Sequence, residues 1–125
     1  MMNSARRVLL VDDFEDSRFS LSKLLEIEGY EVIEASDGAQ AVELALNGKP
    51  DLILMDLSLP VIDGLSATKQ IRQSEEMKSV PIIALTAHDL IDFQDKAIDA
   101  GCTDYATKPV DFNALMLLMS KYLPV

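Results

Sequence analysis

The sequence is poor in residues on which several classes of protein depend. Its 125 residues include one cysteine, one histidine and no tryptophan. The single thiol, Cys102, cannot form an internal disulfide, which excludes a disulfide-stapled miniprotein and is typical of a reducing compartment. We therefore expect Cys102 to pack as a small apolar side chain, and we expect the chain to work in the cytoplasm.

Long apolar runs and a surplus of basic residues are also missing. No apolar stretch approaches the roughly 18–20 residues of a membrane-spanning helix, and the apolar run before Asp12 is too short for a signal peptide. Lysine and arginine number 11 against 21 aspartates and glutamates, giving a formal net charge of −10. This charge argues against a nucleic-acid partner or an anionic membrane surface, and it favours cations or basic partners.

What the chain does have is enough apolar residues, 49% of the total, for the core of one domain. Three apolar runs, at residues 8–11, 52–55 and 82–85, are continuous rather than alternating. Such runs are typical of strands that are covered on both faces. The more polar segments 31–35 and 104–108 are predicted to be edge strands.

Helical patterns separate these strands. Helices are predicted over residues 16–28 and 89–100, and Asp37, Asp63 and Asp111 are predicted N-caps of three more. Strands that alternate with helices in this way predict an α/β fold with a doubly wound, five-stranded parallel sheet and helices on both faces.

Polar side chains follow four of the predicted strands. Asp12 and Asp13 follow the first, Asp56 the third, Thr86 the fourth and Lys108 the fifth. The carboxyl ends of parallel strands meet at one edge of a sheet, where ligands bind. Carboxylates brought together there repel unless they hold a cation, and their oxygens suit Mg²⁺. With a lysine and a hydroxyl nearby, this set fits phosphoryl transfer to Asp56.

In these motifs the chain resembles the receiver domain of two-component response regulators. The matching segments are Val-Asp-Asp at 11–13, Leu-Met-Asp-Leu-Ser-Leu-Pro-Val-Ile-Asp-Gly at 54–64, Ala-Leu-Thr-Ala at 84–87 and Lys-Pro at 108–109. The resemblance implies a flavodoxin-like fold with strand order 2-1-3-4-5. It also implies one receiver domain over residues 1–125, with no effector domain in this chain.

The resemblance implies a function in phosphorelay signal transduction. Asp56 would accept a phosphoryl group from a histidine kinase or a histidine phosphotransfer protein, and the chain would not be a turnover enzyme. Asp13, Asp56 and the backbone carbonyl of Ser58 would bind Mg²⁺ directly, with Asp12 acting through water and Mn²⁺ able to substitute. Ser58 and His88 would tune the lifetime of the phosphoryl group.

Further roles follow from the same resemblance. Lys108 would pair with the phosphoryl oxygens, and a cis peptide bond between Lys108 and Pro109 would direct it to the site. Thr86 would move to hydrogen-bond the phosphoryl group, so that Tyr105 could rotate inward. Ala87 would leave room for the phosphoryl group and offer its N–H.

The last helix carries Leu117 and Leu118 away from its predicted core stripe. Exposed apolar side chains of this kind mark contact surfaces. We therefore predict that the fourth helix, fifth strand and fifth helix form a face that binds a second copy or a target protein. The face is expected to change when Tyr105 moves.

Several alternatives remain open. The chain could be a receiver module from a hybrid histidine kinase or a longer regulator, or a scaffold with the receiver fold, although scaffolds usually lack part of the constellation. A Mg²⁺-dependent aspartyl phosphohydrolase of the haloacid dehalogenase type would carry Asp-x-Asp after its first strand, where residues 12–14 read Asp-Asp-Phe. A flavodoxin would carry a hydroxyl-rich phosphate loop, where residues 12–17 are mostly acidic.

Overall fold

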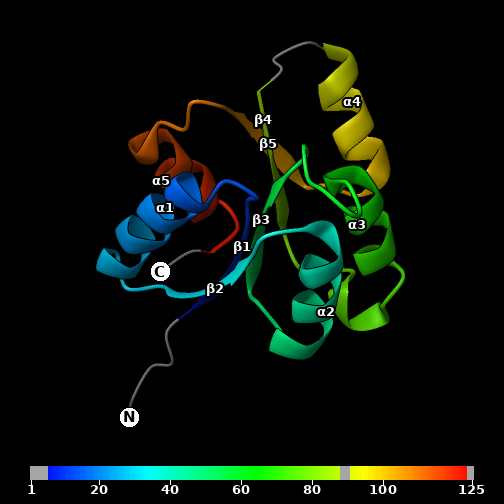
Figure 1. Cartoon of the computed structure of the whole chain (residues 1–125), viewed down its shortest axis with the longest axis horizontal. Helices are drawn as coiled ribbons and strands as arrows, with labels where there is room; N and C mark the ends of the chain where they lie inside the picture. Colours follow the sequence, from blue (N-terminus) through cyan, green and yellow to red (C-terminus); the bar gives the residue numbers. More distant parts are fainter. Residues whose placement is uncertain (1–5, 88–90, 124–125) are drawn as a thin grey trace.

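Five parallel strands form one twisted sheet with helices on both faces (Figure 1). The computed structural model describes residues 6–87 and 91–123. The strands are β1 (Arg7–Val11), β2 (Glu31–Ala35), β3 (Leu52–Asp56), β4 (Ile82–Thr86) and β5 (Asp104–Thr107), in the order β2-β1-β3-β4-β5. The helices are α1 (Glu15–Ile27), α2 (Gly38–Gly48), α3 (Gly64–Arg72), α4 (Ile91–Ala100) and α5 (Phe112–Ser120). The predicted fold and strand order are confirmed.

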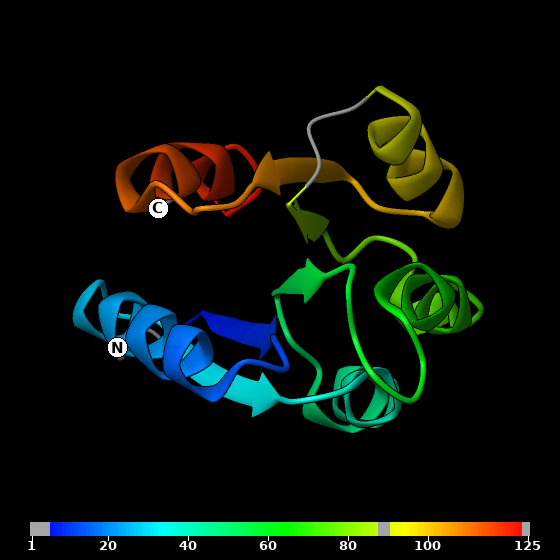
Figure 2. The same ribbon diagram turned by 45° about the horizontal axis from the view of Figure 1, so that its top comes forward.

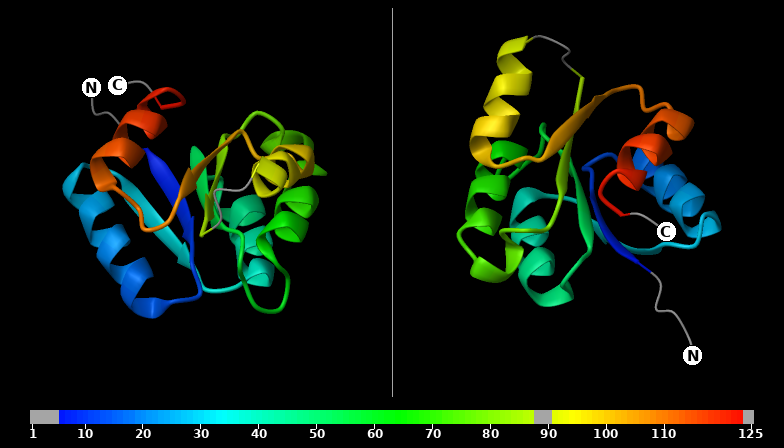
Figure 3. Two further views of the ribbon diagram at one scale, coloured as in Figure 1. Left: turned by 90° about the horizontal axis from the view of Figure 1, so that it is seen from above. Right: turned by 180° about the vertical axis from the view of Figure 1, so that it is seen from behind.

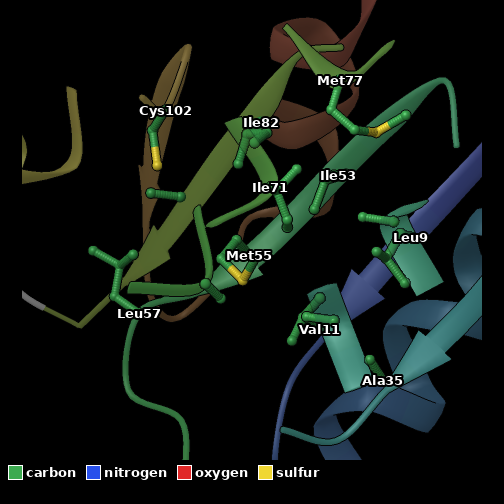
Figure 4. Packing of buried hydrophobic residues seen from close by; sticks show 14 of the residues in the cluster. Leu9, Val11, Ala35, Ile53, Met55, Leu57, Ile71, Met77, Ile82 and Cys102 are labelled. Carbon is green, nitrogen blue, oxygen red and sulfur yellow. The ribbon is translucent and has the colours of Figure 1, made fainter. Parts of the chain in front are cut away.

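Alternation along each central strand creates a core on each side of the sheet. In β1, Leu9 and Val11 point into the core covered by α2, α3 and α4, while Val8 and Leu10 point into the core covered by α1 and α5. Figures 2 and 3 show these two groups of helices on opposite faces of the sheet. Figure 4 shows the packing in the first core, where Met55 lies among side chains from several elements. The continuous apolar runs therefore reflect burial on both faces.

Acidic N-caps start three of the helices, as the sequence predicts. The side chain of Asp37 accepts a hydrogen bond from an N–H in the first turn of α2, Asp63 does the same for α3, and Asp111 for α5. The N-cap position of α1 is Phe14, whose side chain cannot cap. The caps fix where each helix leaves the loop that precedes it, and the loops before α3 and α5 begin next to Asp56 and at Lys108.

Two features differ from the expected packing. Leu24, which the helical pattern places on the core face of α1, is 42% exposed, since Leu25 fills the core there. A short 3-10 helix, η1 (Glu75–Met77), follows α3 and buries Met77. No helix in the described part of the chain is long and apolar enough to cross a membrane.

Candidate functional site

Three carboxylates meet at the carboxyl edge of the sheet. Asp12 and Asp13 directly follow β1, and Asp56 is the last residue of the neighbouring strand β3. One oxygen from each lies within 4.8 Å of one from each of the others. Asp12 and Asp56 are buried, whereas Asp13 is exposed. The parallel register brings these acids together, as the sequence predicts.

Asp56 is held from two sides. One carboxylate oxygen, Oδ1, accepts a hydrogen bond of 2.9 Å from the backbone N–H of Ser58, and Oδ2 accepts one of 2.7 Å from Lys108 Nζ. A Cβ on residue 64 would clash with the backbone oxygen of Asp56, so glycine is needed where α3 starts beside β3. The Asp56 carboxylate therefore has a fixed position.

Lys108 supplies the positive charge of the site. Its Nζ is 2.7 Å from Asp56 Oδ2 and 4.0 Å from Asp12 Oδ2, and its side chain is 29% exposed. The backbone N–H of Lys108 donates a 2.7 Å hydrogen bond to the carbonyl of Thr86, which joins the ends of β4 and β5. The peptide bond between Lys108 and Pro109 is cis, the conformation that the resemblance implies.

The pKa of Asp12 is raised above its ordinary value. Burial is the main cause, and the nearby charges of Asp56 and Asp13 add to it. The hydrogen bond of 2.9 Å from the Phe14 N–H and the charge of Lys108 act in the opposite direction. Burial and the neighbouring carboxylates thus outweigh the stabilisation of the Asp12 carboxylate by Phe14 and Lys108.

The other predicted residues lie around this centre. Thr86 is buried at the end of β4, and Ala87 is exposed just after it. Tyr105 pairs with Ala84 across β4 and β5 and is half-buried against the core. Ser58 is exposed beside Asp56. His88, the second residue predicted to tune lifetime, lies outside the described residues.

Sequence reasoning missed Arg18 in α1. Its guanidinium donates a hydrogen bond of 2.9 Å to the backbone carbonyl of Asp12 and one of 3.0 Å to the carboxylate of Glu34 in β2. A charged residue on an amphipathic helix is expected to face solvent. The contact between Arg18 and the Asp12 carbonyl can therefore be found only from the folded structure.

The donor set fits a small, hard divalent cation. All three groups offer carboxylate oxygens, which are ligands that Mg²⁺ prefers. Within the described part of the chain, the carboxylate of Asp13 accepts no hydrogen bond, so its oxygens are open to a ligand. Three carboxylates beside one lysine leave a net negative charge that a divalent cation would balance.

Two hollows flank the site. One, of about 260 Å³, lies between α1 and the start of α5 and is lined by Asp12, Lys108, Leu21, Leu24 and Phe112 among others. A larger one, of about 460 Å³, lies along β5 and α5. Its lining includes Tyr105, Val110, Ala114, Leu117 and Leu118. Apolar surface thus borders Asp12 and Lys108 in the smaller hollow and Tyr105 in the larger one.

Comparisons with known proteins agree with this geometry. The family model of the response regulator receiver domain matches residues 8–120. The polar-differentiation response regulator DivK of Brucella ovis is 35% identical over 118 residues, which cover 94% of this chain and 96% of that protein.

Two solved structures are also similar. The receiver domain of the sensor histidine kinase PA1611 from Pseudomonas aeruginosa holds a magnesium ion in its active-site cleft. It is 38% identical, with a TM-score of 0.90 over 98% of this chain and 100% of that one. The receiver domain of Ssk1 from Saccharomyces cerevisiae, solved with the histidine phosphotransfer protein Ypd1, is 33% identical. Its TM-score is 0.88 over 98% of this chain and 91% of that one.

Proposed function

Because this chain belongs to the response regulator receiver domain family of two-component phosphorelays, we propose that it accepts a phosphoryl group on Asp56. The observation that carries the proposal is the Asp56 carboxylate, which is buried and bonded to Lys108 Nζ at 2.7 Å within a cluster of two further acids. A buried carboxylate with a fixed position is oriented for attack, and the cation beside it can balance the charge of an incoming phosphoryl group.

The phosphodonor would be a phosphohistidine of a kinase or a histidine phosphotransfer protein. An oxygen of Asp56 forms the new bond to phosphorus while the bond from phosphorus to the histidine nitrogen breaks. The nitrogen keeps the electron pair, and the product on this chain is an acyl phosphate. Lys108 lies where it can pair with the phosphoryl oxygens, because its Nζ already contacts Asp56. The hollow between α1 and α5 borders Asp12 and Lys108, which favours it as the place where the donor docks.

Asp12, Asp13, Asp56 and the backbone carbonyl of Ser58 would hold Mg²⁺, with Asp12 acting through water. The ion supplies positive charge that balances the phosphoryl oxygens during transfer. Mn²⁺ has the same preference for oxygen ligands, so we expect it to substitute. Asp12 and Asp13 need no proton chemistry in this scheme, because their role is to hold charge and position.

We propose that phosphorylation changes the partner-binding face formed by α4, β5 and α5. The buried Thr86 would turn toward the phosphoryl group, Tyr105 would move inward, and the N–H of Ala87 would bind a phosphoryl oxygen. The hollow along β5 and α5 includes Tyr105, so its shape would change. A second copy or a target protein would bind this face.

The chain is proposed to act as a phosphoacceptor with slow self-dephosphorylation, rather than as a turnover enzyme, and to do so in the cytoplasm. The similar proteins include a response regulator and a domain of a sensor kinase, so both kinds of parent protein occur among them. Ser58 and His88 would set how long the phosphoryl group persists.

Incubation with a small phosphodonor and Mg²⁺, followed by intact mass spectrometry and a phosphate-release assay, tests the proposal. We expect one phosphoryl group per chain and slow phosphate release. The label should be absent in Asp56→Asn and in EDTA. Steady release of phosphate from monoesters without stoichiometric labelling would contradict the proposal and support a phosphohydrolase.

A further inference from the structure

Arg18 links three parts of the molecule beside the acidic cluster. Its Nη1 donates a hydrogen bond of 2.9 Å to the backbone carbonyl of Asp12, and its Nε donates one of 3.0 Å to Glu34 Oε1 on the edge strand β2. The side chain is only 18% exposed. An arginine that donates from two nitrogens of its planar fork has both its position and its orientation fixed.

The carbonyl that Arg18 holds belongs to the peptide unit between Asp12 and Asp13. That unit is planar, so fixing its oxygen also fixes the nitrogen of Asp13 and limits the direction of its side chain. The N–H of Asp12 donates to the carbonyl of Ala35 at 3.1 Å, which secures the other side of the same residue. The backbone at Asp12 is therefore held from both sides.

Asp13 depends on this support more than its neighbours do. Asp12 Oδ1 accepts a hydrogen bond from Phe14, and Asp56 accepts hydrogen bonds on both oxygens. In residues 6–87 and 91–123, no such bond reaches the carboxylate of Asp13, which is exposed. Its position beside the other two carboxylates therefore depends on where the backbone directs its Cα–Cβ bond.

We propose that Arg18 is a positioning residue for divalent-cation binding: through the Asp12 carbonyl it directs the Asp13 carboxylate, and Glu34 orients the guanidinium. The inference rests on the proposed function, because it assumes that Asp13 is a ligand. Partners of this kind, which hold ligands without touching the metal, change metal affinity by about 10- to 100-fold when they are removed. We expect Arg18→Met to weaken cation binding about 10-fold, since Asp12 and Asp56 remain in place.

Arg72 offers a matched control for a purely structural role. It also donates to backbone carbonyls, those of Gly101 at 2.8 Å, Met77 at 2.5 Å and Val80 at 2.6 Å. These partners lie near the starts of β4 and β5, at the opposite edge of the sheet from Asp56. Arg72→Met should therefore lower stability at least as much as Arg18→Met without changing cation affinity.

The test is titration of the unphosphorylated full chain with Mn²⁺ by electron paramagnetic resonance and with Mg²⁺ by calorimetry, at a temperature where every variant is folded. We expect weaker binding in Arg18→Met and wild-type affinity in Arg72→Met. Asp13→Asn should bind weakly, and adding Arg18→Met to it should cause no further loss. An interaction of this kind is what a double-mutant cycle measures.

Each outcome decides a separate point. Affinity of Arg18→Met within twofold of the wild type, or a full additional loss in the double variant, would overturn the positioning role. Wild-type protein that binds no cation would instead contradict the proposed function. If Arg18→Met does not fold, Arg18→Lys is the test: it keeps the charge and one donor, so we expect intermediate affinity, and unchanged affinity would overturn the inference.

Discussion

Neutralising Asp13 should make the metal-free protein more stable. The three carboxylates lie within 4.8 Å of one another, and Lys108 contacts Asp56 and Asp12, so the charge of Asp13 is the least compensated of the three. Unfolding removes the repulsion between Asp13 and Asp56, which lie far apart in the sequence, whereas part of the repulsion between the adjacent Asp12 and Asp13 remains. Asp13→Asn removes both repulsions while keeping nearly the same side-chain shape.

The magnitude follows from the distances. Two unit charges 4.8 Å apart repel by about 0.9 kcal/mol in bulk water and about 3.5 kcal/mol at an effective dielectric of 20. Asp13 is exposed, so the lower value applies; it counts in full only for Asp56, and salt weakens it further. We expect Asp13→Asn to raise the free energy of unfolding by roughly 0.5–1 kcal/mol in EDTA.

Urea unfolding with and without Mg²⁺ measures this directly. The wild type should gain stability from Mg²⁺ by mass action, because the folded state binds the ion and the unfolded chain does not. Asp13→Asn should start more stable in EDTA and gain little from Mg²⁺. Asp99→Asn, at an exposed position on α4, is the control and should leave both values unchanged. An Asp13→Asn variant that is less stable in EDTA, or that gains as much from Mg²⁺ as the wild type, would refute the electrostatic reasoning.

Three further predictions concern single residues outside Asp13. Lys108→Met should tighten Mg²⁺ binding several-fold in calorimetry, because it removes a cation 2.7 Å from Asp56. Weaker binding would argue against competition between Lys108 and Mg²⁺ for the Asp56 carboxylate. Val61 has a left-handed backbone, with φ of 68°, and is 80% exposed. Glycine adopts this backbone without strain, so Val61→Gly should raise the free energy of unfolding by roughly 0.5–1 kcal/mol in urea. A lower free energy of unfolding would show that Val61 is not strained. The hydrogen bond of 2.7 Å from the Tyr122 hydroxyl to Asp104 raises the pKa of Tyr122 above its usual value of about 10. Its stabilising contribution is therefore present below pH of about 10 and is lost as pH rises through the folded pKa. In ultraviolet titration, Asp104→Asn should lower the pKa of Tyr122, so that the tyrosine curve of the wild type extends to higher pH than that of the variant.

Much of this fold can be predicted from short segments of the sequence. The apolar runs identified β1, β3 and β4 because strands buried on both faces leave no room for polar residues. The caps Asp37, Asp63 and Asp111 were identified because short acidic side chains at helix starts have a specific partner in the first turn. The convergence of Asp12, Asp56 and Lys108 followed from parallel topology alone.

Features that depend on three-dimensional neighbours could not be found in this way. Leu24 fits the helical stripe of α1, but Leu25 fills the core there, so Leu24 stays exposed. Arg18 and Arg72 look like ordinary charged surface residues in sequence, and their roles come from carbonyls supplied by other segments. The left-handed backbone of Val61 gives no sequence signal, since valine rarely adopts it.

The central claim is that Asp56 carries the phosphoryl group. After treatment with a small phosphodonor and Mg²⁺, reduction with borohydride converts an aspartyl phosphate to homoserine, which peptide mass spectrometry can locate. We expect homoserine at position 56 and at no other aspartate, with none formed when Mg²⁺ is replaced by EDTA. Homoserine at position 12 or 13, or a phosphoryl group that resists borohydride and hydroxylamine, would contradict it.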